Sequence, residues 1–405
     1  MRSYRTIQLF LYTYWFVSIS TLIQTFLIKR KRSESILYLT AFYPGNAGYH
    51  WRAEKWAEEL RAEGKKVTLM HALDEEEFRN LLKHDFNQFL LLYLKRRFWQ
   101  VLESRKYETV IVQRELLVYN DYGNLFLEKL MLRLHPDAIL DFDDDLSAAK
   151  NQPRKITNRY GKLIQEHGDK FNASLKLYKH FIVASDYLKN RVLEQNTKID
   201  EQNVCVIPTC VDYDNFPAKD YSTRQGPIVL GWIGGDHNYH LLDLVIPSLN
   251  RLSATYPFKF KLIGGSTPDF KTDFKLEFIP WSLKREIDEL LTIDVGLMPL
   301  PDDAESRGKG AFKLIQYMGL GIVSIASPIT INKQIVKHGT NSLLAMTERE
   351  WDEAFENILS GQLNLSELGK NARSTIERNY TFKGNKEKYF EFIEHVRNSR
   401  HLDNS

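Results

Sequence analysis

Short apolar runs alternate with amphipathic helical stretches along most of the chain. In the first half the apolar runs are residues 36–40, 67–71, 107–113, 138–142 and 181–184. They continue with residues 204–208, 228–233, 258–263, 276–279, 295–300 and 322–326. Short strands separated by helices are typical of parallel α/β sheets, because each parallel connection needs a crossover. Two such series predict an α/β protein with two doubly wound domains.

Residues 293–327 contain the most informative crossover. The run 295–300 leads through a loop to a Gly308-Lys309-Gly310 turn. A helix that carries Lys313 and Gln316 in its first turns follows. Such loops lie beyond the carboxyl ends of the strands, where open α/β sheets bind ligands. Backbone N–H groups, the positive end of a helix and an ammonium group together suit a diphosphate. A solvated loop with two surface lysines is the alternative.

The same stretch resembles the donor-site segment of family 4 glycosyltransferases, which have the GT-B fold. It is most similar to a bacterial subgroup that carries Gly-Lys, then Phe-Lys-Leu, then Gln-Tyr-Met. The matching residues are Gly308-Lys309, Phe312-Lys313-Leu314 and Gln316-Tyr317-Met318. The larger family has two glutamates separated by seven residues here, whereas this chain has Gly308 and Gln316 in those places. The resemblance covers roughly residues 35–395.

The resemblance implies a GT-B fold, in which two Rossmann-like domains face a cleft. Residues 33–215 would form the acceptor-side domain and residues 216–378 the nucleotide-sugar-binding domain. Residues 379–405 would form a helix that packs back across the junction. From the strand-end turns and the resemblance together, we expect donor-binding residues at Gly234, Gly235, Trp281, Ser282, Gly308, Lys309, Gly310, Phe312, Lys313 and Gln316.

Gly234-Gly235 ends one apolar run, and a glycine turn lets the backbone approach a phosphate. The family often has an Arg–Lys pair just after this turn. In this chain the corresponding residues are Asp236, His237, Asn238 and His240. We therefore expect Lys309 and Lys313 to neutralise the diphosphate and to act as catalytic residues that stabilise the leaving group.

Residues 140–145 place four carboxylates at the end of a strand. In glycosyltransferases of the other major fold, Asp-x-Asp holds a divalent metal. Here the acids lie outside the expected nucleotide-binding half, so we expect no metal site. Family 4 enzymes commonly have a His-Asp pair at this strand end, and Asp144-Asp145 occupy the corresponding places. By resemblance, Asp144 would stabilise positive charge on the sugar ring. An acidic strand end that caps the next helix is the alternative.

Two further clusters follow strands of the first half. His50 and Arg52 come after the first glycine loop, and Arg114 follows the run 107–113. In a doubly wound domain these side chains would face the cleft and bind acceptor hydroxyls or phosphates. A structural salt bridge is the alternative for Arg114.

Composition limits the partners of the chain. Its 405 residues include 55 Lys and Arg against 52 Asp and Glu, so the net charge is only +3 and nucleic-acid binding is not indicated. The two cysteines, Cys205 and Cys210, lack zinc-type spacing and indicate buried thiols in a reducing compartment. We expect no cofactor other than the donor substrate, a UDP- or GDP-linked sugar.

The N-terminus indicates a membrane anchor in residues 1–32. Residues 6–28 contain no charged side chain, and Lys29-Arg30-Lys31-Arg32 follows. As a helix they would extend roughly 35 Å, enough to cross a hydrocarbon core of about 30 Å. The basic cluster favours a location at the cytoplasmic face of the inner (plasma) membrane. Because the run carries a polar stripe, the alternatives are a helix in the interface or one packed on the protein.

Residues 89–99 form an apolar-aromatic helical stretch with Lys95-Arg96-Arg97 on it. Such a helix suits an anionic membrane surface. A core-packing helix with a solvated basic side is the alternative.

These features predict a membrane-attached, retaining, metal-independent glycosyltransferase. It would move a sugar from a nucleotide-diphosphate donor to a lipid-linked or cell-envelope glycan acceptor, as in bacterial polysaccharide biosynthesis. A nucleotide-sugar epimerase of the same fold and a catalytically inactive scaffold are the alternatives. The scaffold stays open because both family glutamates and the usual basic pair are absent.

Overall fold

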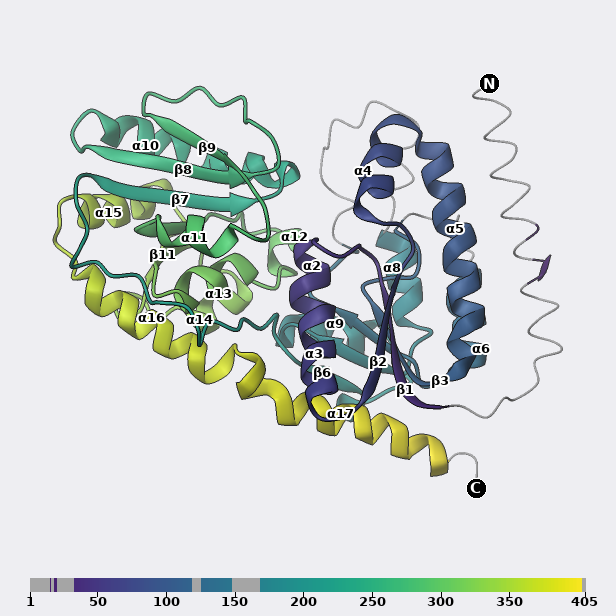
Figure 1. The fold of residues 1–405 in the computed structure, drawn as a ribbon. Coiled ribbons are helices and arrows are strands. Elements are labelled where there is room, and N and C mark those ends of the chain that lie inside the picture. Colours follow the sequence, from purple (N-terminus) through teal and green to yellow (C-terminus); the bar gives the residue numbers. More distant parts are fainter. Residues whose placement is uncertain (1–14, 16–17, 20–32, 119–124, 148–167, 403–405) are drawn as a thin grey trace. The chain divides into compact units, whose positions relative to one another are not determined.

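The computed structural model describes residues 15, 18–19, 33–118, 125–147 and 168–402. The chain divides into two compact units. Unit 1 comprises Met1–Pro208 and Lys386–Ser405, and unit 2 comprises Thr209–Asn385. Each unit contains a six-stranded sheet in which all paired strands are parallel, with helices packed on it (Figure 1). The predicted α/β fold with two parallel sheets is confirmed.

The sheet of unit 1 has the strand order β2-β1-β3-β4-β5-β6. Its strands are β1 (Ser33–Thr40), β2 (Lys66–His71), β3 (Tyr107–Gln113), β4 (Ile139–Phe142), β5 (His180–Val183) and β6 (Val204–Val206). Its main helices are α2 (Ala47–Tyr49), η1 (His50–Glu54), α3 (Lys55–Ala62), α4 (Glu75–His84), α5 (Phe86–Glu103), α6 (Phe126–Leu134), α8 (Gly168–Leu175) and α9 (Asp186–Gln195). Short 3-10 turns are η2 (Ser104–Lys106) and η4 (Glu201–Asn203). From β1 the chain places β2 on one side and then β3 on the other. The topological switch point of this sheet therefore lies between β1 and β3.

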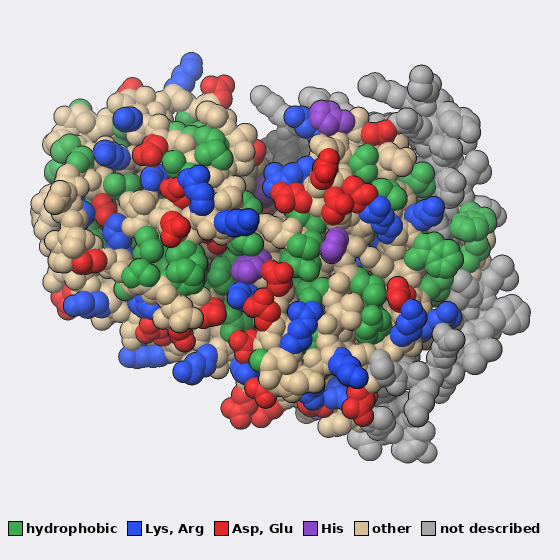
Figure 2. Space-filling model, in the orientation of Figure 1, with side chains coloured by type: hydrophobic (Ala, Val, Ile, Leu, Met, Phe, Trp, Pro, Cys, Tyr) green, Lys and Arg blue, Asp and Glu red, His purple; other side chains and the backbone are tan. Residues whose placement is uncertain are grey.

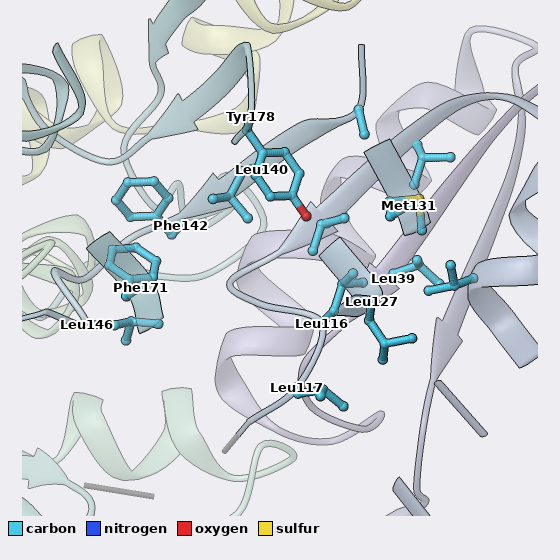
Figure 3. Packing of buried hydrophobic residues seen from close by; sticks show 14 of the residues in the cluster. Leu39, Leu116, Leu117, Leu127, Met131, Leu140, Phe142, Leu146, Phe171 and Tyr178 are labelled. Atoms are coloured by element: carbon cyan, nitrogen blue, oxygen red, sulfur yellow. The ribbon is translucent and has the colours of Figure 1, made fainter. Parts of the chain in front are cut away.

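The hydrophobic core of unit 1 fills the space between the sheet and its helices. Strand residues such as Leu39 and Leu140 meet Leu127 and Met131 of α6 there (Figure 3). Both faces of β1 are buried, because Ile36 and Tyr38 are as inaccessible as Leu37 and Leu39. A continuous apolar run of this kind is expected where helices cover both faces of a parallel sheet.

The sheet of unit 2 has the order β12-β11-β10-β7-β8-β9. Its strands are β7 (Ile228–Gly234), β8 (Phe258–Gly264), β9 (Leu276–Pro280), β10 (Val295–Met298), β11 (Val323–Ala326) and β12 (Leu343–Leu344). Its helices are η5 (Asp236–Leu244), α10 (Ile246–Ser253), α11 (Glu286–Leu291), α12 (Ala304–Arg307), α13 (Phe312–Gly319), α14 (Thr330–Ile335), α15 (Glu348–Leu359) and α16 (Leu365–Asn379). From β7 the chain places β8 and β9 on one side and then β10 on the other. The topological switch point of this sheet therefore lies between β7 and β10.

Helices cover both faces of the unit 2 sheet. Val295 and Leu297 of β10 belong to the core cluster that includes residues of α10 and α15. On the other face, Tyr317 of α13 packs against Gly296, and α13 packs against α16. Successive positions along β10 face opposite sides of the sheet, as in any β-strand. Unit 2 is therefore a doubly wound α/β unit.

Helix α17 (Phe382–Leu402) is shared by the two units. It begins in unit 2 and continues in unit 1, where Tyr389 stacks on Trp56 with ring centroids 4.0 Å apart. The Tyr389 and Tyr38 hydroxyl groups are 2.5 Å apart. The C-terminal helix thus completes the core of unit 1.

Helix α5 packs into the core of unit 1. Phe89, Tyr93 and Phe98 belong to the core cluster, and Trp99 is exposed. The basic residues do not form one solvated side, because Arg97 is fully buried and donates to the carbonyl oxygen of Thr40 over 2.6 Å. These contacts favour the core-packing alternative for residues 89–99.

Within the described residues, no helix combines the length and the apolar composition that a bilayer span requires. The expected anchor, residues 6–28, lies outside those residues except for Trp15, Ser18 and Ile19. Ile19 packs against the core cluster of unit 1.

The surface carries both signs of charge. On the face shown in Figure 2, acidic and basic side chains are interspersed over both units. This mixture agrees with the net charge of +3, which sums 55 cations and 52 anions.

A buried ion pair joins the η1 turn to the end of β4. Arg52 Nε donates to Asp141 Oδ1 over 2.6 Å, and both side chains are 0% exposed. A second guanidinium nitrogen of Arg52 donates to the carbonyl oxygen of Ile207 over 2.6 Å. Burial raises the pKa of Asp141 to about 6, and the charge of Arg52 opposes that rise. Arg52 is thus buried in unit 1 by structural contacts, and its acceptor-side role stays a prediction.

Removing the cation of this pair is expected to destabilise unit 1. Arg52→Met leaves the Asp141 carboxylate buried without its partner, which typically costs about 3–5 kcal/mol. Urea denaturation should show the loss in the unfolding transition of unit 1. Arg52→Met/Asp141→Asn should recover much of it, and Arg105→Met, at an exposed arginine, should leave stability unchanged. Equal stability of Arg52→Met and the wild type would contradict this role.

Candidate functional site

The strands of unit 2 end at one edge of the sheet in a set of turns. Because parallel strands share their carboxyl edge, the segments after β7, β8, β9 and β10 meet there. The first three are Gly234-Gly235, Gly264-Gly265 and Trp281-Ser282. After β10 comes the loop that leads to α13. The edge therefore gathers the donor-binding residues expected from the sequence, around the switch point between β7 and β10.

The loop after β10 is ordered by short-range hydrogen bonds. Asp303 caps α12 by accepting from the backbone N–H of Ser306 over 2.8 Å. The N–H of Lys309 donates to the carbonyl oxygen of Ser306 over 3.2 Å. Ala311 then takes a left-handed conformation with φ +56, and α13 begins at Phe312. The N-cap residue, Ala311, has no polar side chain with which to cap this helix. Its dipole and first N–H groups therefore lie at the edge where an anion would bind.

Lys313 lies in the first turn of α13 and reaches back over β7. Its Nζ is 4.4 Å from the centroid of the Trp232 ring. A Cβ at position 234 would lie 2.8 Å from Lys313 Cε and closer still to Trp232, so only glycine permits this approach. Lys313 thus brings its ammonium beside the Gly234 turn, where the family's basic pair is missing.

Lys309 lies on the same loop, with its Nζ 3.3 Å from Glu305 Oε1. Both side chains are largely buried, at 19% and 12% exposure. Glu305 was not anticipated from the sequence. A carboxylate four residues before Lys309 holds the ammonium in place and makes the local charge of the loop less positive than two lysines would suggest.

Asp236 ties two strand-end turns together. Its carboxylate accepts from the backbone N–H of Ser266 over 3.0 Å and from the Ser266 hydroxyl over 2.6 Å. Gly265 allows this approach, because a Cβ there would lie 2.5 Å from Asp236 Oδ1. Burial raises the pKa of Asp236, but the hydrogen bonds from Ser266 outweigh it and leave the pKa below its usual value. The residue in the place of the basic pair is thus a structural carboxylate.

A buried polar cluster includes Gln316, one turn after Lys313 on α13. Glu286, the first residue of α11, is 3% exposed. Its carboxylate accepts from Gln316 Nε2 over 2.7 Å and from Trp281 Nε1 over 2.6 Å. Tyr213 is buried next to them, and burial, reinforced by the charge of Glu286, raises the pKa of this phenol. The sequence analysis placed Gln316 and Trp281 at the site but missed the carboxylate that joins them.

Ser282 and Phe312 flank this cluster and are half-buried. Gly308 and Gly310 are buried in the loop that holds Lys309. All ten expected donor-binding residues therefore belong to unit 2.

The expected acceptor-side residues belong to unit 1. His50 Nδ1 is 2.7 Å from Glu54 Oε2, and both lie in the π-helical turn η1 that follows the first glycine loop. Arg114 follows β3 with φ +69, a left-handed conformation that costs a non-glycine residue energy. Its guanidinium lies 5.2 Å from the centroid of the Phe42 ring. His50 and Arg114 thus follow the two strands that flank the switch point of unit 1.

The acidic residues at the end of β4 contact different partners. Asp141 pairs with Arg52, and Asp145 accepts from Arg191 Nε over 3.2 Å. Burial, together with the neighbouring Asp144, raises the pKa of Asp143. Asp144 is half-buried and lies in unit 1. Within the described part of the chain, no three His, Cys, Asp or Glu side chains are grouped to hold a metal ion.

Comparison with known proteins identifies the fold. No protein-family model and no curated sequence matches the chain. Sucrose-phosphate synthase from Thermosynechococcus elongatus is similar with a TM-score of 0.62 at 13% identity, over 89% of this chain and 99% of that one. A glycosyltransferase from Rickettsia africae gives 0.61 at 14% identity, over 90% and 99%. Anabaena HepE in complex with UDP-glucose gives 0.58 at 12% identity, over 92% and 100%.

These structures share the two-unit architecture of glycosyltransferases, so the chain has the GT-B fold expected from the sequence. At identities of 12–14% the similarity shows the fold alone. The chemistry must be argued from the residues of the site. The subgroup, the donor motif and the site residues remain predictions.

Proposed function

We propose that this chain is a retaining glycosyltransferase that takes a sugar from a UDP- or GDP-linked donor. The observation that carries the proposal is the start of α13, where Lys309 and Lys313 lie beside the N-terminus of the helix. It lies at the switch point of a doubly wound sheet, which is where such sheets bind nucleotides. The shared fold with glycosyltransferases, one of them in complex with UDP-glucose, supports the same class of donor.

The chemistry proposed for unit 2 is stabilisation of the leaving diphosphate. Negative charge develops on the departing phosphate oxygens, and preorganised ammonium and N–H groups stabilise it. In the retaining reaction of this fold, a departing phosphate oxygen removes the proton of the acceptor hydroxyl on the same face of the sugar. Gln316 lies one turn after Lys313 on the same side of α13, and we assign it to the ribose. Asp144 is assigned to the positive charge that develops on the sugar ring.

The proposed chemistry is metal-independent. Two acids of the acidic strand end, Asp141 and Asp145, already bind arginine side chains. The lysines supply the positive charge that a divalent ion supplies to the diphosphate in other glycosyltransferases.

The acceptor is proposed to be a lipid-linked or cell-envelope glycan, held by unit 1. His50 and Arg114 follow strands at its switch point and offer groups for hydroxyls or phosphates. Residues 1–32 are proposed to hold the enzyme at the cytoplasmic face of the inner membrane, beside such an acceptor. This proposal is supported by the uncharged run 6–28 and the four cations that follow it.

A panel of UDP- and GDP-linked sugars, assayed with and without membrane lipids, tests the activity. We expect transfer to the lipid fraction from one donor, at an unchanged rate in EDTA. Release of free sugar or an epimer without acceptor would indicate the epimerase. No turnover of any donor would indicate the inactive scaffold, and loss in EDTA restored by Mn²⁺ or Mg²⁺ would contradict metal independence.

Replacing the lysines is expected to weaken nucleotide binding. Each forms charge-assisted contacts worth about 1.5–3 kcal/mol, so Lys309→Ala and Lys313→Ala should each lower affinity for the nucleoside diphosphate about 10–100-fold. Isothermal titration calorimetry gives the affinity, and circular dichroism checks the fold. Lys259→Ala, at an exposed lysine near the amino end of β8, is the control. Unchanged affinity in both test variants would rule out the assignment.

Deleting residues 1–32 is expected to lower activity on a membrane-embedded acceptor but not on a soluble one. The anchor holds the enzyme in the same thin layer as its acceptor and so raises the effective concentration. The truncated chain should bind nucleotide normally and act on a soluble acceptor analogue, but turn over acceptor in vesicles at least about tenfold more slowly. Equal sedimentation with vesicles and equal rates for both forms would contradict the anchor.

A further inference from the structure

Arg114 is held in a strained backbone conformation at the carboxyl edge of the unit 1 sheet. It follows β3 directly, at the switch point beside β1, and its φ of +69 lies in the left-handed region. Its backbone N–H donates to the carbonyl oxygen of Asp141 over 2.6 Å, which fixes the turn. Arginine has no preference for this region, and residues held in such conformations cluster at sites that bind ligands.

The guanidinium of Arg114 is held in place but keeps hydrogen-bonding capacity. The side chain is 32% exposed, and the guanidinium lies over the Phe42 ring, 5.2 Å from its centroid. Nε is buried without a hydrogen-bond partner among the described residues. Glu115 Oε1 is 3.7 Å from Nε, which is beyond hydrogen-bond distance. Because a guanidinium carries five N–H donors, the group can still bind an acceptor of hydrogen bonds.

The neighbouring carboxylates do not neutralise Arg114. Glu115 is shared with Lys170, whose Nζ lies 3.8 Å from Glu115 Oε2. Lys170 is 2% exposed, so its ammonium needs this carboxylate in place of water. The charge of Arg114 opposes the burial that raises the pKa of Asp143, but among the described residues no ion pair joins the two side chains. Two cations therefore share the carboxylate of Glu115, which leaves Arg114 able to bind an anion.

We propose that Arg114 binds a phosphate group of the acceptor, so that the acceptor is a phosphate-linked lipid glycan rather than a neutral glycan. This inference rests on the proposed function. A guanidinium offers parallel N–H donors that match two oxygens of one phosphate. Phe42 supports its flat face, and the strained turn holds it at the edge where unit 1 is proposed to bind the acceptor.

The test compares the binding of farnesyl diphosphate with that of farnesol, which has the same prenyl chain but no phosphate. Both are titrated by calorimetry, in one detergent, into the full chain carrying Lys309→Ala/Lys313→Ala, because those lysines could also bind a diphosphate. This parent should prefer the diphosphate at least about tenfold. Arg114→Asn should abolish the preference. Arg114→Lys keeps the charge without the fork of donors and should retain only part of it.

Two comparisons separate phosphate binding from stability and from general charge. Asparagine adopts the left-handed region more readily than arginine, so Arg114→Asn should leave Tm unchanged or raise it. Arg79→Gln removes a cation of the same unit whose Nε already contacts the Tyr43 hydroxyl at 3.2 Å and Glu75 Oε1 at 2.9 Å. Because Arg79 is exposed and has these partners, its loss should change the preference by no more than about twofold.

A parent that binds both prenyl compounds equally, or neither, would overturn the phosphate site. An unchanged preference in Arg114→Asn, or an equal loss in Arg79→Gln, would overturn it too. A clear fall in Tm for Arg114→Asn would give the residue a structural role instead.

Vesicles with and without phosphatidylglycerol test the other source of phosphate. If Arg114→Asn weakens binding to the anionic vesicles but not to farnesyl diphosphate, the ligand is a lipid headgroup and the acceptor assignment is wrong. If the wild type turns over no nucleotide sugar while the preference of Arg114 for the diphosphate is intact, the proposed function fails and the phosphate site stands.

Discussion

The constraint on which the proposed donor site depends is the concentration of positive charge at the start of α13. Helix N-termini leave several backbone N–H groups without partners in the helix, and here two lysines lie beside them. Such an arrangement is unfavourable unless an anion or a carboxylate compensates it. Glu305 partly compensates Lys309, and the π-surface of Trp232 accepts the ammonium of Lys313. The proposed diphosphate site thus has its two ammonium groups held in place without being a strongly cationic surface.

The sequence predicted the fold well because the relevant signals are local. Short apolar runs separated by helices already specify parallel sheets, and Gly308-Lys309-Gly310 correctly indicated the loop before α13. The sequence identified a turn at Gly234, but it did not show why the turn needs a glycine. The glycine is needed because Lys313 and Trp232, distant in sequence, converge on it.

Other features depend on contacts that no local pattern contains. Arg52 was expected to bind the acceptor, and the sequence did not show that its guanidinium reaches Asp141, 89 residues away, inside unit 1. Glu286 was not identified from the sequence, and only the positions of Trp281 and Gln316 reveal the buried cluster that it joins. The left-handed conformation of Arg114 is equally invisible, because arginine shows no preference for it. In each case the tertiary partner, rather than the residue type, determines the role.

The division of α17 between the units has a consequence for biosynthesis. Trp56 and Tyr38 of unit 1 complete their packing against Tyr389, which the ribosome adds only after the whole of unit 2. At about 5–20 residues per second, the intervening segment takes roughly 10–35 s to make. During that interval an apolar surface of unit 1 stays without its final helix while unit 2 emerges and folds. The order of folding is then the reverse of the order of synthesis: the unit that begins the chain is the last to be finished, and it needs protection from aggregation in the meantime.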